Sequence, residues 1–408
     1  MAWYDEAVFY HIYPLGLAGA PKQNDYGEPV HRLNTLLPWV DHIKEIGGSA
    51  LYIGPLFESV GHGYETTDYK KLDSRLGTNE DLTAFVAYCH EQGIKVIFDG
   101  VFNHTGRDFF AFKDIQANRE NSHYKDWYCN VNFWGNNEYN DGFSYDNWGG
   151  YNLLVKLNQK NPAVVDYICD VIRFWVREYH VDGFHLMGEG VPAQMLAGDP
   201  ALSGTKLWHY SFDTEQLYDP AVKPEYRNLA EYRDDYLYTM RRFLKGDDNM
   251  LSGVLYEMRH IPANMGRIHY LSNYYGLTLM DMVSYDHKHN EANGEGNRDG
   301  NDYNCSWNCG EEGPSRRKKV LALRKKQLQN AFCMLLLTQS TPLIFMGDEF
   351  GNSQQGNNNP YCQDNKITWL NWQDREKNAE LLNFWKQMIA FRKAHPILPP
   401  VEELRILD

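Results

Sequence analysis

Short apolar runs alternate with amphipathic segments along most of the chain, and this rhythm restricts the possible folds more than any other feature. One segment carries Leu82, Phe85, Val86 and Cys89 at positions i, i+3, i+4 and i+7, which places them on one face of a helix. The run Ile94–Phe98 that follows is typical of a buried parallel strand. Strand, helix and strand at these spacings predict βαβ units.

Eight such strands can be assigned, and they predict an α/β protein with a (β/α)8 TIM barrel. The expected strands are Val8–Tyr13, Ala50–Ile53, Ile94–Phe98, the start of Val181–Gly190, Lys206–Phe212, Asn228–Tyr232, Ile268–Asn273 and Pro342–Met346. The helices carry recognisable ends. Thr78 and Asp81 form a capping box, Asn161 precedes Pro162 as an N-cap, and Gly246 ends a helix.

Residues 105–160 interrupt the rhythm with a segment rich in Asn, Gly and aromatic residues. We therefore expect three parts: residues 1–104 as the first part of the barrel, 105–160 as an insertion after the third strand, and 161–408 as the rest of the barrel. The aromatic residues of positions 124–151 allow two interpretations. They form a small local core, or they offer flat rings as a stacking surface.

The stretch VDGFHLMGEG at Val181–Gly190 ends the fourth strand. Together with DGVFNH at Asp99–His104 and GYETTDY at Gly63–Tyr69, it resembles the α-amylase superfamily, glycoside hydrolase family 13. The closer similarity is to glycogen-debranching and isoamylase-like members, on the segments Asn228–Leu251, Val283–Gly300 and Asn358–Trp372. The resemblance implies a barrel with a long insertion after the third strand and an α-glucan as the substrate.

The same resemblance implies three catalytic carboxylates, and none stands at its matching position. Retaining glycoside hydrolysis uses two carboxyl groups about 5–5.5 Å apart, one as nucleophile and one as general acid/base. By alignment the nucleophile position is Met187, the acid/base position is Tyr210 and the third carboxylate position is Tyr275. The family's Arg and His neighbours correspond to His185 and Tyr274. The chain therefore resembles a catalytically degenerate member of the family.

Two other carboxylates could take over part of this chemistry. Glu257 lies 16 residues before Asn273, which is too close to leave room for a strand and a helix between them. Glu189 lies two residues after Met187, so in a strand its side chain would point to the same side and could act as a displaced carboxylate. A turn residue at the barrel rim is the simpler interpretation of Glu189.

Several sugar-contacting positions of the family are retained. Tyr64 matches the family's stacking aromatic residue, although a packed tyrosine at a strand end is an equal alternative. His104 matches a residue that hydrogen-bonds the sugar, and Asp99 one that mainly braces the site. For Asp99 and Asn103, structural hydrogen bonding at the barrel mouth is the favoured interpretation. His185 and Tyr274 complete the expected binding set.

The substituted positions carry bulky side chains, which we expect to fill part of the pocket. Three functions remain open. The first is an α-glucan-binding barrel without hydrolysis. The second is a pseudoenzyme that serves as a protein-interaction scaffold. The third is an enzyme with altered chemistry at a mouth rich in His and Tyr, and an active debranching enzyme would require the alignment to be wrong at three strands.

Composition limits the partners and the location. A net charge of −14 argues against nucleic acid and anionic membranes, whereas a neutral glucan meets no such objection. No apolar run is long enough to span a membrane, and no signal peptide is visible. Seven cysteines without framework spacing favour reduced thiols in a cytoplasmic protein. We expect no cofactor and no metal site, and the family's outer β-domains have no matching segments.

Overall fold

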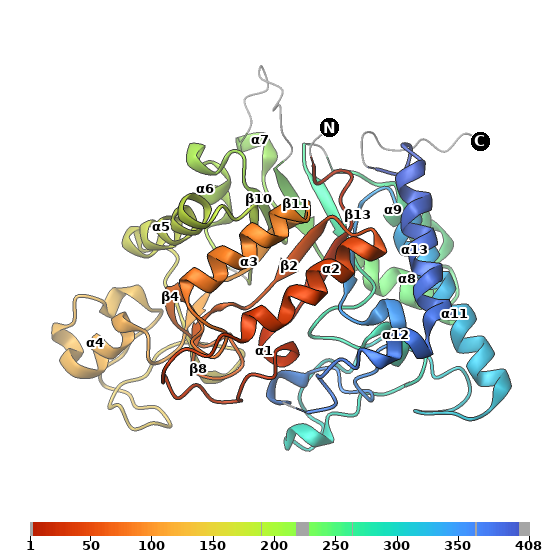
Figure 1. The fold of residues 1–408 in the computed structure, drawn as a ribbon. Helices are drawn as coiled ribbons and strands as arrows, with labels where there is room; N and C mark the ends of the chain where they lie inside the picture. The colour runs from red at the N-terminus through yellow and green to blue at the C-terminus, as the bar shows by residue number, and fades with distance from the viewer. Residues whose placement is uncertain (1–2, 189, 218–227, 263, 364, 400–408) are drawn as a thin grey trace.

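The computed structural model describes residues 3–188, 190–217, 228–262, 264–363 and 365–399. Eight parallel strands close into a barrel in the order β1-β13-β12-β11-β10-β9-β5-β2. These strands are β1 (Phe9–Ile12), β2 (Ala50–Ile53), β5 (Lys95–Val101), β9 (Gly183–Met187), β10 (Lys206–His209), β11 (Leu229–Tyr232), β12 (Gly266–His269) and β13 (Thr341–Phe345). The predicted (β/α)8 barrel is confirmed (Figure 1).

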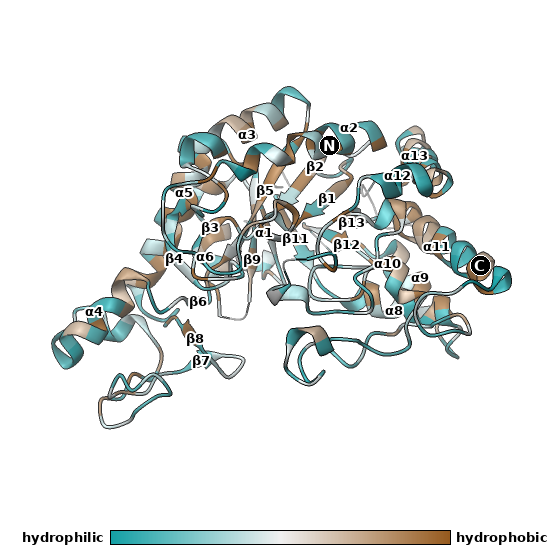
Figure 2. Cartoon of the chain, turned by 60° about the horizontal axis from the view of Figure 1, so that its bottom comes forward, coloured by the Kyte–Doolittle hydropathy of each residue, from teal (hydrophilic) through white to brown (hydrophobic). Residues whose placement is uncertain are grey.

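Helices surround the barrel, with α2, α3, α5, α11 and α13 ringed around the central strands (Figure 2). The helices are α1 (Pro14–Leu17), α2 (Leu37–Ile46), α3 (Asn79–Glu91), α4 (Phe110–Asn118), α5 (Pro162–Tyr179), α6 (Ala193–Ala197), α7 (Thr214–Leu217), α8 (Asp235–Lys245), α9 (Leu251–Arg259), α10 (Leu279–Met282), α11 (Lys318–Leu337), α12 (Gln373–Lys377) and α13 (Ala379–Ala394). No helix of the described part of the chain has the length and apolar character that crossing a membrane requires.

Two buried clusters divide the core. The larger one lies between strands and helices, as in other α/β barrels. The smaller one fills the barrel, because alternate residues of each strand point inward. Its strand members include Phe9, Tyr52, Ile97, Trp208, Tyr232, Ile268 and Leu343. The interior is therefore an aromatic packed core and not a channel.

The segment between β5 and α5 leaves the barrel and projects to one side (Figure 1). It contains α4 and a three-stranded antiparallel sheet in the order β6-β8-β7. These strands are β6 (His104–Thr105), β7 (Asn147–Trp148) and β8 (Tyr151–Lys156), and a separate hairpin pairs β3 (Phe57–Ser59) with β4 (Thr66–Leu72). Below, "the insertion" denotes residues 105–160.

Several expected strand ends differ from the observed ones. The seventh strand was expected at Ile268–Asn273, but β12 ends at His269. The physical reason is Arg241 of α8, whose guanidinium donates two hydrogen bonds to the Leu271 carbonyl oxygen and so keeps it from a strand partner. β10 ends at His209, three residues before the expected Phe212. β5 continues to Val101, which places Asp99 inside the strand.

The predicted helix ends are observed. Thr78 and Asp81 form both hydrogen bonds of a capping box at α3. Gly246 ends α8 in the left-handed conformation. At α5, the Asn161 side chain accepts a hydrogen bond from the Ala163 N–H at 2.9 Å. This cap sets the start of the helix that leads into β9.

We expect Asn161→Ala to destabilise the protein by about 1 kcal/mol and to lower its melting temperature by about 2 °C, because the helix loses its capping acceptor. Asn161→Asp keeps an accepting oxygen and is the matched control. Calorimetry of both variants checks this. Equal destabilisation by the two substitutions would show that the cap hydrogen bond is not the cause.

Candidate functional site at the barrel mouth

The carboxyl ends of the parallel strands meet at one face of the barrel, which we call the mouth. Met187 is the last residue of β9 and pairs with Val101 of β5. Tyr210 directly follows β10, and Tyr275 lies on the loop after β12. Met187 and Tyr210 therefore lie at strand ends of this face, whereas Tyr275 lies six residues beyond the end of β12.

The expectation that these bulky residues fill the pocket is correct for Tyr274 and only partly for the others. Tyr274 is buried, and its ring stacks on Tyr13 with centroids 4.1 Å apart. Met187 is half-buried. Tyr210 and Tyr275 are 60% and 43% exposed.

The barrel interior is instead filled by a cluster centred on His185. The His185 Nδ1 atom and the Tyr52 hydroxyl are hydrogen-bonded at 2.7 Å, and Asp99 Oδ1 lies 3.9 Å from the same nitrogen. The Tyr232 ring lies 4.2 Å from the imidazole. Asp99, His185 and Tyr52 are all buried, so a substrate has no direct access to them.

Burial also sets the charge of this cluster. It raises the pKa of Asp99 to about 7 and lowers the pKa of His185 well below its ordinary value. Asp99 Oδ1 is buried and has no hydrogen-bond partner among the described residues. A neutral imidazole beside a carboxyl group that is about half protonated follows near pH 7. The cluster therefore packs the inner mouth, and the structural hydrogen bonding favoured for Asp99 from the sequence stays a prediction.

Arg233 and Asp234 occupy the rim of the mouth directly after β11, and the sequence analysis overlooked them. The Arg233 guanidinium lies 4.5 Å from the centre of the Tyr210 ring. Asp234 Oδ1 accepts hydrogen bonds from the hydroxyl of Tyr270 at 2.8 Å and from that of Tyr275 at 3.4 Å. The two residues thus link the substituted positions after β10 and β12. The sequence could have indicated both residues, because they directly follow a predicted strand of the barrel.

The retained family positions lie on the other side of the mouth. Tyr64 is half-buried, with its ring 6.1 Å from that of Tyr274. His104 is buried, and its Nε2 atom donates to the Tyr64 carbonyl oxygen at 2.8 Å. Burial lowers the pKa of His104 to about 4, so the ring is neutral and its Nδ1 atom is an acceptor. This Nδ1 atom is buried without a partner within the described part of the chain.

Neither alternative carboxylate is placed as a catalyst. Glu257 lies on α9, and its carboxylate is 2.9 Å from Arg267 at the start of β12, which is the opposite end of the barrel. Glu189 lies outside the described residues. The described residues also contain no group of three or more His, Cys, Asp or Glu side chains that could hold a metal ion.

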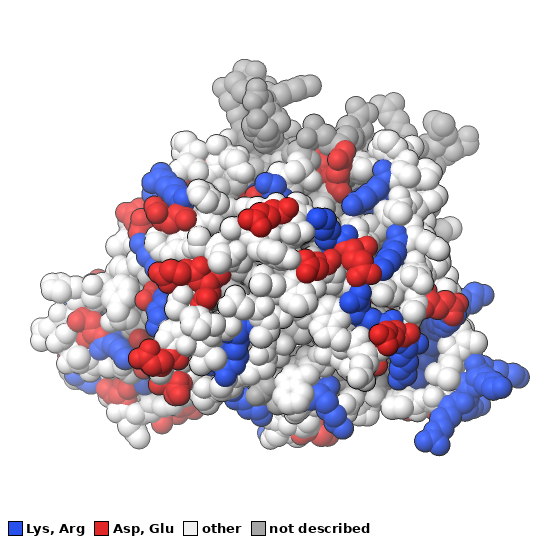
Figure 3. Space-filling view, in the orientation of Figure 1, with Lys and Arg blue, Asp and Glu red and all other residues white. Residues whose placement is uncertain are grey.

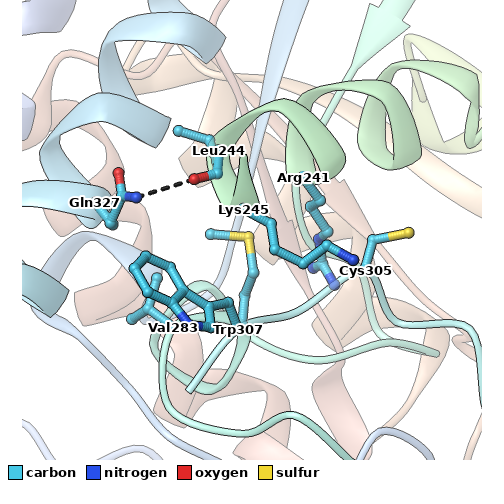
Figure 4. A pocket seen from close by; sticks show the side chains of 8 residues that line it. Arg241, Leu244, Lys245, Val283, Cys305, Trp307 and Gln327 are labelled. Carbon is cyan, nitrogen blue, oxygen red and sulfur yellow. Dashed lines mark hydrogen bonds between the residues drawn. The ribbon is translucent and has the colours of Figure 1, made fainter. Parts of the chain in front are cut away.

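A small cavity lies between α8, α11 and the loops that follow α10 (Figure 4). Its volume is about 10 Å³, which is room for about one water molecule. Gln327 donates a hydrogen bond to the Leu244 carbonyl oxygen across it at 2.9 Å. The cavity is too small for a sugar, so any sugar contact falls to the rim and the open surface.

Asp99→Asn provides a test of the charge at the mouth. A carboxyl group whose folded pKa is about 7 binds more protons in the folded than in the unfolded protein between about pH 4 and 7, so it reduces stability as the pH rises through that window. Asparagine cannot ionise. We expect the variant to gain about 2 kcal/mol relative to the parent between pH 5 and pH 8.

Urea unfolding at the two pH values measures this difference, with Asp166→Asn at an exposed position of α5 as the control. A stability difference between Asp99→Asn and the parent that stays the same from pH 5 to pH 8 would mean that Asp99 is already charged in the folded protein at pH 5.

Comparison with known proteins agrees with this architecture. Residues 28–377 match the family model described as Alpha amylase, catalytic domain. The chain is 30% identical to Isoamylase SU1 of Zea mays, over 94% of this chain and 55% of that protein. It is 33% identical to the Glycogen debranching enzyme of Pectobacterium carotovorum, over 88% of this chain and 58% of that protein. The chain therefore spans about half the length of these relatives.

Solved structures share the fold. The cyclic α-maltosyl-(1→6)-maltose hydrolase of Arthrobacter globiformis, in complex with maltose, superposes with a TM-score of 0.72 at 22% identity, over 97% of this chain and 85% of that one. The debranching enzyme of Nostoc punctiforme gives 0.70 at 20% identity, over 97% and 81%. The barrel, the order of its strands and the match over residues 28–377 show that the chain belongs to the α-amylase catalytic-domain family.

Proposed function

We propose that this chain binds α-glucan at the barrel mouth without hydrolysing it. The proposal is supported by the alignment expected from the sequence, which puts Met187, Tyr210 and Tyr275 at the positions of the family's carboxylates. Retaining hydrolysis requires a carboxylate nucleophile and a carboxyl acid/base. A thioether can neither transfer a proton nor form a productive glycosyl ester.

The remaining carboxyl groups of the described mouth are poorly suited to replace that pair. Asp99 is 2% exposed and faces His185 inside the barrel. Asp234 is half-buried and already accepts hydrogen bonds from two tyrosine hydroxyls. Burial raises the pKa of both groups. Losing all members of a catalytic unit leaves little beyond binding.

Features of the mouth support a neutral sugar as the ligand. Tyr64, Tyr210 and Tyr275 offer rings at the rim, and rings of this kind stack on the apolar face of a sugar. The relatives are named isoamylases and glycogen debranching enzymes, which act on α-glucans.

A second function, a protein-interaction scaffold, is favoured by one observation. Tyr52, His185, Tyr232 and Tyr274 are all buried at the inner mouth, so these four side chains offer no open surface to a sugar. A partner protein would then use the rim as a surface. Altered chemistry at the His and Tyr residues is disfavoured by the same burial.

Isothermal titration with branched maltodextrin distinguishes these functions. We expect heat that saturates and then stops, and binding that weakens about tenfold in Tyr64→Ala because a stacking ring is lost. Tyr64→Phe keeps the ring and should bind as the parent does. Tyr256→Ala on α9, at the opposite end of the barrel, is the matched control.

Other outcomes would contradict the proposal. Heat that continues after mixing would mean turnover, and an active debranching enzyme would be the correct description. If none of the proteins releases heat, maltodextrin does not bind, and the protein-interaction scaffold becomes the favoured function. A pull-down with the full chain would then test for a protein partner.

A further inference from the structure

The insertion carries an open hollow that lies apart from the barrel interior. Two segments form it, Asn130–Asn132 and Ser144–Asp146, and its volume is about 470 Å³. The segments are joined by backbone hydrogen bonds in both directions between Asn132 and Ser144, at 2.8 and 2.9 Å. Its volume is within the range of small-ligand sites, about 300–1,000 Å³.

Neutral polar groups dominate the lining. Asn130, Asn132 and Ser144 supply amide and hydroxyl groups that can both donate and accept, and Asp146 adds one carboxylate. Asn130 Nδ2 donates to Asp146 Oδ2 at 2.7 Å, which holds the two side chains together across the hollow. Such a set matches the hydroxyl groups of a sugar, which also donate and accept.

A single indole ring stands beside this hollow. Trp134 is 98% exposed, and its ring contacts no other aromatic ring or cation among the described residues. Its backbone N–H donates to Asn132 Oδ1 at 3.0 Å, so the ring is attached two residues from the lining. Both faces of the indole are therefore free to stack on a sugar.

The segments around Trp134 are held in place by a local core. The rings of Phe112, Phe143 and Tyr145 pack against one another with centroids 5.1 to 6.0 Å apart. The Arg107 guanidinium pairs with Asp141 at 2.7 Å and donates to the Tyr145 hydroxyl at 2.6 Å. A rigid support lowers the entropy cost of binding. The exposed tryptophan is thus presented by an ordered scaffold.

We propose that Trp134 and the hollow form a second binding site for a neutral α-glucan chain, separate from the residues of the barrel mouth. The choice of glucan as the ligand rests on the proposed function. The connection along the chain is short, because Asp146 of the hollow lies two residues before Trp148, whose ring is 6.1 Å from that of His104.

The charge of the protein excludes the main alternative ligands. With a net charge of −14 and acidic and basic side chains interspersed over the face in Figure 3, a polyanion gains little from long-range attraction. The lining carries no cation, so a phosphate or carboxylate group would meet only Asp146. A neutral polyhydroxyl ligand needs no long-range attraction and is not repelled by Asp146.

Fluorine NMR of the full chain labelled with 5-fluorotryptophan tests the site directly. The chain has 11 tryptophans, and the Trp134 signal is assigned by its absence in Trp134→Phe. We expect maltoheptaose to shift this signal in the parent. The shift should persist in Tyr64→Ala, which disables the mouth and so separates the two sites.

Migration in native gels containing glycogen gives the second readout. We expect Trp134→Ala to bind glycogen about fivefold more weakly while keeping the parent's melting temperature, because the ring makes no packing contact. Phe243→Ala, which removes a 41% exposed ring on α8, is the matched control and should migrate as the parent does.

Each result decides one proposal. A Trp134 signal that stays fixed at saturating maltoheptaose overturns the second site, whatever the mouth does. A shift in the parent that vanishes in Tyr64→Ala also overturns it, because the indole would then report only on the mouth. The third result combines the two experiments. If maltoheptaose shifts the Trp134 signal in Tyr64→Ala, and calorimetry shows that Tyr64→Ala binds maltodextrin as the parent does, the second site is supported and the proposed mouth site is contradicted.

Discussion

The pairing of β5 with β9 is the constraint on which the mouth depends. It sets Asp99 opposite His185 and Val101 opposite Met187, so the inward side chains of the two strands meet at one level of the barrel. Tyr52 from β2 then reaches the imidazole, and Tyr232 from β11 covers its other side. A register shift by one residue would turn all these side chains toward the helices.

This packing determines the electrostatics of the mouth. Charged groups are costly to bury, and the barrel interior therefore holds a neutral imidazole and a carboxyl group whose pKa is raised to about 7. Charge is kept at the rim, on Arg233 and Asp234, where tyrosine hydroxyls and rings contact it. The interior serves as a support, and the rim is the part that can meet a ligand.

The aromatic residues of the insertion form a local core and also provide exposed rings, which were the two interpretations that the sequence allowed. Phe143 and Tyr145 are buried in a local core, whereas Trp134 and Trp148 are exposed. The sequence could not separate these roles, because the antiparallel bridge between Asn132 and Ser144 decides which rings turn inward. The same limit applies at the barrel. Tyr210 and Tyr275 are exposed on loops whose course the periodicity of the sequence does not predict.

The sequence by itself determined the eight-stranded barrel and the capping of α3, α5 and α8, because periodicity and cap residues are local properties. Only the tertiary structure decided that β12 ends at His269, where Arg241 takes the Leu271 carbonyl oxygen. It alone placed Glu257 at the far end of the barrel and brought Asp234 to the mouth. These outcomes depend on contacts between segments far apart in the chain, and such contacts form only when the barrel closes.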